Sequence, residues 1–374
     1  MPRLLNYQTG LILLALILSP SLVVFSQAGM TSAPFLQIEP ETRSGSMGNA
    51  FTALSDDNSA MFFNPAGLAF QHSNSISITH VNWLPSFDDD LFFDFIAYKH
   101  HIERIGTFGF HTTYLNYGSQ RQTGENGEDL GSFKSYELSI GFSYGYQINQ
   151  FHSFGFGLKY IKSQIIPQGL KVSGQSMSSG NSFSFDLGYL FRTKSSDSDL
   201  NFSGLGFSLT NFGQGLQYSD KAQVDPLPLM LRSGFLINTS LDTEGYNLLR
   251  LTFDVSKLMA RIDIDGKSMS PFKALYSSWN DYNIRYDLNS SDVQTVTLSD
   301  QLMYSMGLEY IYNTIFALRS GFYTESKLNG DRSYLTFGSG FMYNIFSFDF
   351  GYLYSIKVDN PIANTIRLSL SVSL

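Results

Sequence analysis

One short motif in this chain matches a hydrolase pattern. Gly141-Phe-Ser143-Tyr-Gly145 fits G-x-S-x-G, which in hydrolases exposes a nucleophilic serine on a sharp turn between a strand and a helix. Here the alternation of apolar and polar residues runs straight through the motif, so we expect Ser143 inside a strand with its side chain in the interior. The sequence supplies no base beside this serine. We therefore expect no enzymatic activity; the opposing hypothesis, a lipid hydrolase, predicts that Ser143→Ala abolishes activity.

Histidines and one acidic tripeptide are the candidates for metal binding. The six histidines are His72, His80, His100, His101, His111 and His152. They show no H-E-x-x-H or comparable spacing. Asp88-Asp89-Asp90 could offer oxygen ligands to a hard cation such as calcium, but the other ligands of a known calcium loop are missing. We expect solvated side chains here, with no metal and no cofactor.

Composition indicates the elements that must position these residues. Charged residues make up 15% of the 374 residues and aromatic residues another 15%, with 33 Phe, 22 Tyr and 32 Gly. This combination is unusual for a soluble α/β enzyme and is typical of a β-barrel with an aromatic, lipid-facing surface. The formal net charge of -8 argues against a nucleic-acid partner, which requires clustered Lys and Arg. The absence of cysteine excludes disulfides.

The N-terminus has the pattern of a secretion signal. Arg3 precedes an apolar run over residues 11–25, and Ser26-Gln27-Ala28 supplies the small residues of a cleavage site. The alternative is a membrane anchor, but the run falls short of the ~20 apolar residues that a spanning helix needs. We expect residues 1–28 to be a signal peptide that is cleaved after Ala28.

From Ser75 onward, apolar residues recur at every second position, which places them on one face of a strand. Residues 135–148 illustrate the pattern: the even-numbered positions carry Tyr, Leu, Ile and Phe, while the odd-numbered positions carry Ser, Glu, Gly and Gln. Fourteen such segments are predicted at residues 75–83, 91–100, 104–116, 134–148, 152–166, 181–193, 200–212, 229–240, 246–258, 301–312, 314–325, 332–343, 346–356 and 363–374. An even number is what bacterial outer-membrane barrels require.

The connections between these segments alternate in length. Those after odd-numbered strands are long, including residues 117–133, 167–180, 214–228 and 259–300, while most even connections are tight. Short periplasmic turns and longer outer loops are typical of outer-membrane barrels. Because unpaired strand edges are costly in hydrocarbon, the first and last strands must pair. We predict an all-β, 14-stranded antiparallel transmembrane barrel over residues 75–374, located in the cell outer membrane and contacting its lipid.

The stretch 45–70 is the helix-compatible, turn-rich part of residues 29–74. Asn64-Pro65 is a helix-start signal, because Asn caps free backbone donors and proline suits the first helical position. The simplest alternative is a short amphipathic helix outside the barrel. Fourteen strands enclose more space than their own side chains fill, so we expect residues 29–74 to form a plug in the lumen. The predicted plug motif comprises Gly45, Gly48, Asp56, Asp57, Asn58, Asn64, Pro65 and Gly67.

Charged residues on the polar face of the strands are the other candidate site residues. The predicted lumen-facing charges are Glu137, Lys159, Asp186, Asp254, Asp349 and Arg367. Facing the lumen avoids the ~2–4 kcal/mol cost of Arg or Lys on the lipid face at the bilayer midplane. We expect these groups to pair with one another or with the plug.

Two blocks of residues give the chain a resemblance to a known family. The first block comprises Pro34-Phe35-Leu36, Ile38, Pro40, Arg43, Gly45, Met47-Gly48, Ala50, Asp56-Asp57-Asn58-Ser59 and Asn64-Pro65-Ala66. The second includes Gly307, Glu309-Tyr310, Arg319, Gly321-Phe322-Tyr323, Glu325, Gly330, Arg332 and Asn364-Thr365-Ile366-Arg367-Leu368. With these residues the chain resembles the PorV branch of the PorV/PorQ family, FadL-like outer-membrane barrels associated with type IX secretion. Residues 75–230 match the family pattern only weakly.

The resemblance implies a role in protein secretion. PorV-like proteins bind the type IX translocon barrel, receive secreted substrates by their C-terminal domains and carry them to a sortase attachment complex. The long loops 214–228 and 259–300 are then the expected contact surfaces, since long loops tend to be functional; the alternative is that they only shield the barrel mouth. A FadL-like transporter of hydrophobic small molecules is the alternative function, and it predicts an apolar pocket that reaches a lateral gap.

Overall fold

The computed structural model describes residues 31–85, 90–123, 128–167, 171–172, 175–193, 201–219, 223–260, 268–285, 293–357 and 360–374. The predicted signal peptide, residues 1–28, lies outside the described residues, as do Asp88 and Asp89. No helix in the described ranges is both long enough and apolar enough to cross a membrane.

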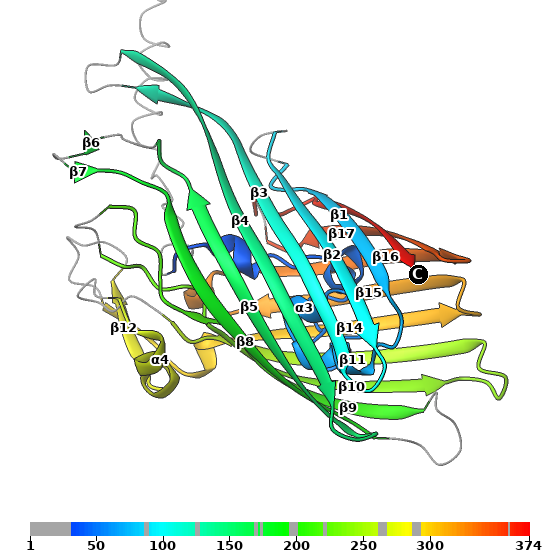
Figure 1. Ribbon diagram of the computed structural model, residues 1–374. Helices are drawn as coiled ribbons and strands as arrows, with labels where there is room; N and C mark the ends of the chain where they lie inside the picture. Colours follow the sequence, from blue (N-terminus) through cyan, green and yellow to red (C-terminus); the bar gives the residue numbers. More distant parts are fainter. Residues whose placement is uncertain are drawn as a thin grey trace, which may run out of the picture.

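Fourteen antiparallel strands form one closed barrel, as the alternation predicts (Figure 1). Its strands are β1 (Ser75–Asn82), β2 (Phe92–Ile102), β3 (Gly106–Thr123), β4 (Asp129–Gln147), β5 (His152–Gln164), β8 (Gly180–Arg192), β9 (Phe202–Gly213), β10 (Met230–Ser240), β11 (Asn247–Leu258), β14 (Leu302–Tyr312), β15 (Phe316–Glu325), β16 (Ser333–Tyr343), β17 (Phe346–Ser355) and β18 (Ile366–Ser373). The barrel closes where β1 pairs with β18, with Ile76 opposite Val372. Closure satisfies the backbone donors and acceptors that an open sheet would expose to lipid.

The two faces of the wall separate the side chains by polarity. In β4, Ile140 and Tyr146 are about half exposed on the outside, while Glu137, Ser139 and Ser143 are buried on the inside. The prediction that Ser143 lies within a strand and faces the interior is therefore confirmed. An apolar exterior around a polar interior is the arrangement that a lipid-embedded barrel requires.

The connections differ in length between the two ends of the barrel. At one end, tight turns join β14 to β15 and β16 to β17, and they place Asn313 and Asn344 at φ values of 49° and 55°. Asparagine tolerates this left-handed conformation better than most residues. The other end, called the outer end below, carries the long loops, which in such barrels face away from the periplasm.

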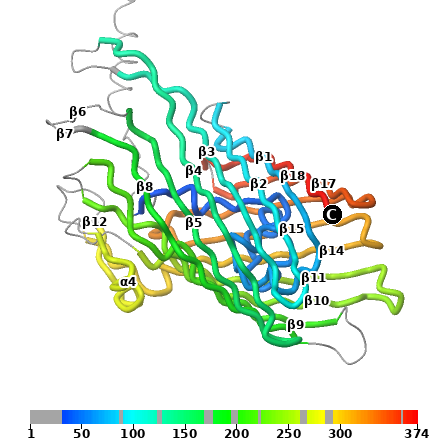
Figure 2. Tube along the Cα trace, viewed as in Figure 1, coloured from blue at the N-terminus to red at the C-terminus, as the bar shows by residue number. Residues whose placement is uncertain are grey.

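One predicted outer loop is largely strand in the structure. Residues 117–133 were expected to be a loop, but β3 and β4 stay paired from Asn116 opposite Tyr136 as far as Thr123 opposite Asp129, through two register shifts. The two strands extend past the others as a ribbon (Figure 2). Along the ribbon Ser119 and Gln120 are both exposed, so consecutive residues meet solvent and no apolar alternation marks the strand.

The loops at the outer end contain small elements. Their described residues include two short hairpins, β6 (Lys171–Val172) with β7 (Gln175–Ser176) and β12 (Tyr282–Arg285) with β13 (Val293–Val296). Helical turns are α4 (Pro271–Ser277), η4 (Ser299–Gln301) and η5 (Lys327–Asn329). The 259–300 loop contains α4 and the β12–β13 hairpin, and η4 begins at its end.

Residues 31–74, called the inner segment below, run through the barrel (blue in Figure 1). The segment contains η2 (Pro34–Gln37), α2 (Thr42–Ser46), α3 (Ala60–Phe63) and η3 (Pro65–Phe70). η3 packs against β3, β4, β5 and β8, whereas α2 packs against β15 to β18. The segment therefore contacts widely separated parts of the wall. Its Met47, Phe51 and Phe63 are almost completely buried, and burial of each side chain contributes about 1.5–3 kcal/mol.

Candidate functional site

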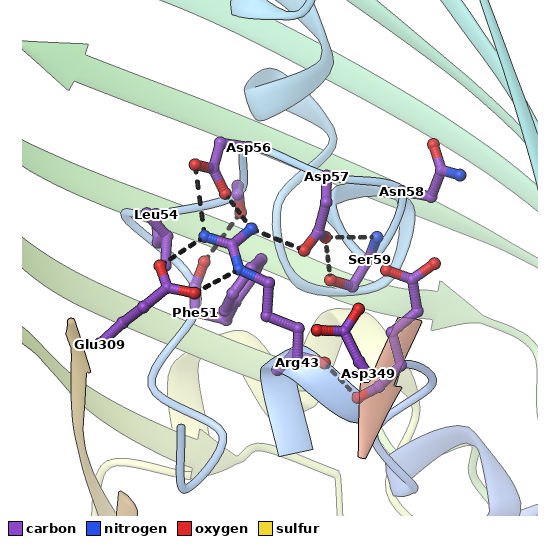
Figure 3. Close-up of polar contacts among 12 residues, drawn as sticks. Arg43, Phe51, Leu54, Asp56, Asp57, Asn58, Ser59, Glu309 and Asp349 are labelled. Carbon is purple, nitrogen blue, oxygen red and sulfur yellow. Dashed lines mark hydrogen bonds and ion pairs between the residues drawn. The ribbon is translucent and has the colours of Figure 1, made fainter. Parts of the chain in front are cut away.

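The most concentrated polar cluster joins the inner segment to the barrel wall around Arg43 (Figure 3). The Arg43 guanidinium binds both carboxylate oxygens of Glu309 on β14, with both N–O distances 2.8 Å. It also contacts Asp56 at 2.6 Å and Asp57 at 2.8 Å, two carboxylates of its own segment. A planar guanidinium suits such paired, geometrically fixed contacts with carboxylates.

Two wall arginines extend this cluster. Arg250 on β11 lies 3.0 Å from Glu309 and 3.2 Å from Asp56. Arg319 on β15 lies 2.7 Å from Glu309 and 2.5 Å from Asp349 on β17. Three arginines and four carboxylates thus form one network, called the Arg43 network below. Each charge has an opposite partner, which offsets the cost of removing it from water.

The electrostatics of the inner segment follow from this burial. Burial lowers the pKa of Arg43, but Asp56 and Glu309 outweigh it, so the pKa lies well above its ordinary value. Burial raises the pKa of Asp56, but Arg43 and Arg250 outweigh it, and the net shift is downward. Both groups are held in their charged forms.

Glu41 behaves differently from the network carboxylates. Burial, followed by the neighbouring charge of Asp57, raises the pKa of Glu41 well above its ordinary value. Its carboxyl oxygen accepts a 2.5 Å hydrogen bond from the Ser77 hydroxyl on β1. Glu41 is a buried proton-binding group beside a charged cluster.

The three predicted plug-motif glycines lie at close backbone or side-chain approaches. Gly48 has a φ of 61°, and a Cβ there would lie 2.5 Å from the backbone nitrogen of Phe322 on β15. A Cβ on Gly67 would lie 2.1 Å from the Ser55 carbonyl oxygen. Gly45 lies in α2, where a Cβ would be 3.2 Å from Arg367. Gly48 and Gly67 therefore have no room for a larger residue, whereas a Cβ at Gly45 would require a small shift of neighbouring side chains.

The predicted polar residues of the motif all make hydrogen bonds. Asp56 and Asp57 bind Arg43, and Asp57 also accepts a 2.9 Å bond from the Ser59 backbone. The Asn58 side chain exchanges hydrogen bonds with the hydroxyls of Ser75 and Ser77 on β1, at 3.0 and 2.8 Å.

Asn64 caps η3 and also reaches the wall. Its side-chain oxygen accepts a 3.1 Å bond from the Ala66 N–H, and Pro65 occupies the first helical position. The predicted helix start is therefore present, although the helix is of the 3₁₀ type. The Asn64 amide group donates to the carbonyls of Thr52 and Tyr189, both at 3.0 Å.

All six predicted lumen-facing charges lie on the inner face, but the structure does not bring them to one place. Lys159 pairs with Asp186 at 2.9 Å. Glu137 accepts hydrogen bonds from the Tyr117 and Ser163 hydroxyls at 2.7 and 2.8 Å. Asp349 belongs to the Arg43 network.

The other two charges bind the inner segment. Asp254 accepts the backbone N–H groups of Phe51 and Thr52 at 2.9 and 2.8 Å. Arg367 donates to the Glu39 carbonyl at 2.8 Å and forms an ion pair with the Glu39 carboxylate. Wall and segment are therefore joined by β11 and β18 residues that lie outside the Arg43 network.

The candidates for chemistry show no catalytic or metal arrangement within the described ranges. The Ser143 hydroxyl is buried and has no hydrogen-bond partner there. No group of three or more His, Asp or Glu side chains in the same ranges is placed to hold a metal ion. Of the acidic tripeptide only Asp90 is described, and its carbonyl accepts a 2.9 Å bond from Asn116.

Arg250 was not predicted to be a functional residue. Arg43, Glu309 and Arg319 were noted in the sequence but were not assigned to a functional site. For the wall residues a signal was available, because all three occupy inward positions of the alternation. In the sheet Arg250 is opposite Glu309, and Glu309 is opposite Arg319. Arg43 carries no such signal, because its segment has no strand periodicity.

Comparisons with known proteins complete the description. A family model described as type IX secretion system protein PorV matches residues 26–264. No protein of curated function gives a significant match. Among solved structures, the Pseudomonas putida toluene transporter TodX is similar at 14% identity and a TM-score of 0.53, covering 90% of this chain and 98% of TodX. The deltaS2 mutant of the TodX monoaromatic hydrocarbon channel gives 14% and 0.52, with 89% and 98% covered. At such identities the likeness shows the barrel fold alone.

Proposed function

Because this chain belongs to the PorV family of type IX secretion system proteins, we propose that it binds the translocon barrel of that system and carries secreted substrates to the surface attachment complex. In this proposal the substrates are held by their C-terminal domains. The observation that carries the proposal is the family match over residues 26–264. The chain is an outer-membrane protein, so its outer loops reach the surface where attachment takes place.

The packing of the inner segment supports a docking role over a conducting one. The segment is tied to β14 by Arg43, to β11 by Asp56 and Asp254, and to β18 by Arg367. A segment bound through several buried charged contacts is costly to displace, because each broken contact leaves a buried charge unpaired. In our proposal residues 29–74 act as a plug that keeps the lumen closed.

The proposed contact surfaces are the outer loops 214–228 and 259–300. Residues 214, 217, 223 and 224 are exposed in the first, and Val224 is an apolar residue among them. Loops carried on a rigid barrel are suited to recognition, because the scaffold fixes their bases. The role of Ser143 in this proposal is structural, and the protein has no catalytic activity.

A detergent pull-down of the tagged protein from its native membrane tests the proposal. We expect the translocon barrel and subunits of the attachment complex to be recovered. Val224→Arg should lower the recovery, whereas Leu241→Arg, which changes an exposed residue in the β10–β11 turn at the opposite end, should not. If the wild-type protein recovers no translocon or attachment subunit, the proposal fails.

That failure would favour the alternative of a FadL-like transporter of hydrophobic small molecules. The alternative requires the inner segment to move and open a path to a lateral gap. Purified protein in vesicles would then pass a hydrophobic solute across the bilayer, which the proposed closed lumen forbids.

A further inference from the structure

Helix α4 in the 259–300 loop and the turn that follows it present an exposed aromatic face. Phe272, Tyr276 and Trp279 are 68%, 80% and 43% exposed. Phe272 and Tyr276 are four residues apart and lie on the same side of α4, and Trp279 lies in the turn two residues beyond its last residue, Ser277. Large apolar side chains gathered on one exposed face mark an interaction surface.

The opposite face of α4 packs on the outside of the barrel. Ala274 is fully buried in a cluster with Leu209 of β9 and Leu231 of β10. Both leucines occupy outward positions of their strands, in line with the exposed Phe207 and Phe235. The helix therefore covers the lipid-facing side of the wall rather than the lumen, and it lies at the outer end beside β12 (Figure 1).

Local contacts fix the orientation of α4. The Ser270 side chain caps the helix by accepting a 3.3 Å bond from the Lys273 N–H. Phe272 packs edge-on against Phe212, with ring centroids 5.0 Å apart. The indole N–H of Trp279 donates to the Leu275 carbonyl at 2.9 Å. These contacts hold Phe272 beside the wall, and the Lys257 ammonium of β11 lies 5.9 Å from the centre of the Trp279 ring, while Tyr276 remains 80% exposed.

The surface below α4 is continuous with this face. A groove of about 540 Å³ on the outer wall is lined mainly by apolar side chains, among them Phe207, Leu209 and Leu231. Leu209 and Leu231 are shared with the cluster under α4. The groove on the outer wall is therefore continuous with the cluster on which α4 packs.

We propose that α4 is an interfacial anchor that inserts Phe272, Tyr276 and Trp279 among the lipids of the outer leaflet. Amphipathic aromatic rings favour the boundary between hydrocarbon and headgroups. Lys273, exposed on the same helix, is placed to meet lipid phosphate. The anchor fixes the height of the 259–300 loop relative to the membrane surface.

Tryptophan fluorescence tests this anchor independently of secretion. The chain has two tryptophans, so Trp83→Phe leaves Trp279 as the only reporter. In vesicles of phosphatidylcholine, we expect bromine near the headgroup to quench Trp279 more than bromine near the chain end, and iodide quenching to be several-fold weaker than for free tryptophan. Strong iodide quenching without quenching by brominated lipid would overturn the proposal.

Two further sets of variants complete the test. Phe272→Ser with Tyr276→Ser should increase iodide quenching of Trp279 several-fold, whereas Phe272→Leu with Tyr276→Phe should not. An unchanged signal in the serine variant would contradict insertion through this face. Phe235→Trp, in a chain lacking both native tryptophans, is the positive control and should respond most to deep bromine. Heat-dependent mobility on gels confirms that each variant is folded.

Discussion

Replacing Arg43 by methionine tests how the inner segment is held. Methionine keeps much of the side-chain volume but removes the cation that contacts Asp56, Asp57 and Glu309 at 2.6–2.8 Å. The network would then have two arginines for four buried or partly buried carboxylates. Breaking a buried pair by removing one partner costs about 3–5 kcal/mol, and we expect that loss in the free energy of unfolding.

The assay is equilibrium unfolding by guanidinium in lipid, combined with protease sensitivity of the inner segment. Arg104→Met is the matched control, because Arg104 is 91% exposed and lies 3.9 Å from Glu103. It should change stability by less than ~0.5 kcal/mol. Adding Asp57→Asn to Arg43→Met should restore part of the loss, because Asp57 pairs with Arg43, whereas Asp56 and Glu309 also contact Arg250. An Arg43→Met effect as small as that of the control would show that the Arg43 contacts do not hold the inner segment in place.

Three further predictions concern the same segment. Burial, followed by the charge of Asp57, raises the pKa of Glu41, so the folded state binds a proton more tightly than the unfolded state. The free energy of unfolding should therefore fall as the pH rises above 4.5, the ordinary pKa of the group. In Glu41→Gln, this contribution to the pH dependence of the unfolding free energy should be absent. Gly48→Ala, at φ 61° and against the β15 backbone, should lower the unfolding free energy by about 2–5 kcal/mol, whereas Gly204→Ala should be tolerated in the same denaturant titration. Asp254→Ala leaves two buried N–H groups without an acceptor and should cost about 2–6 kcal/mol by denaturation, with Asp254→Asn costing less.

The barrel could be predicted because each strand contacts two different media. Lipid selects the apolar residues outside, and the enclosed interior selects residues such as Ser139 and Lys159 inside. That alternation gave fourteen strands and their closure, and it placed all six predicted charges on the inner face. The β3–β4 ribbon could not be predicted, because both of its faces are exposed to solvent and its sequence therefore shows no alternation of apolar and polar residues.

The partners of those charges could not be predicted from alternation. Which carboxylate meets Arg43 depends on the irregular path of the inner segment, and that path is fixed by close approaches such as Gly48 against β15. The register that places Arg250, Glu309 and Arg319 in one row required the paired strands themselves. Helix α4 could not be predicted because its seven residues are too few to show a helical period.

The most direct test of the proposed function is surface attachment of a secreted substrate in cells from which this protein has been deleted. Our account predicts that the substrate is no longer attached at the surface, and that re-expression of the wild-type chain restores its attachment. Normal attachment in the deletion strain, together with lost uptake of a hydrophobic solute, would contradict it.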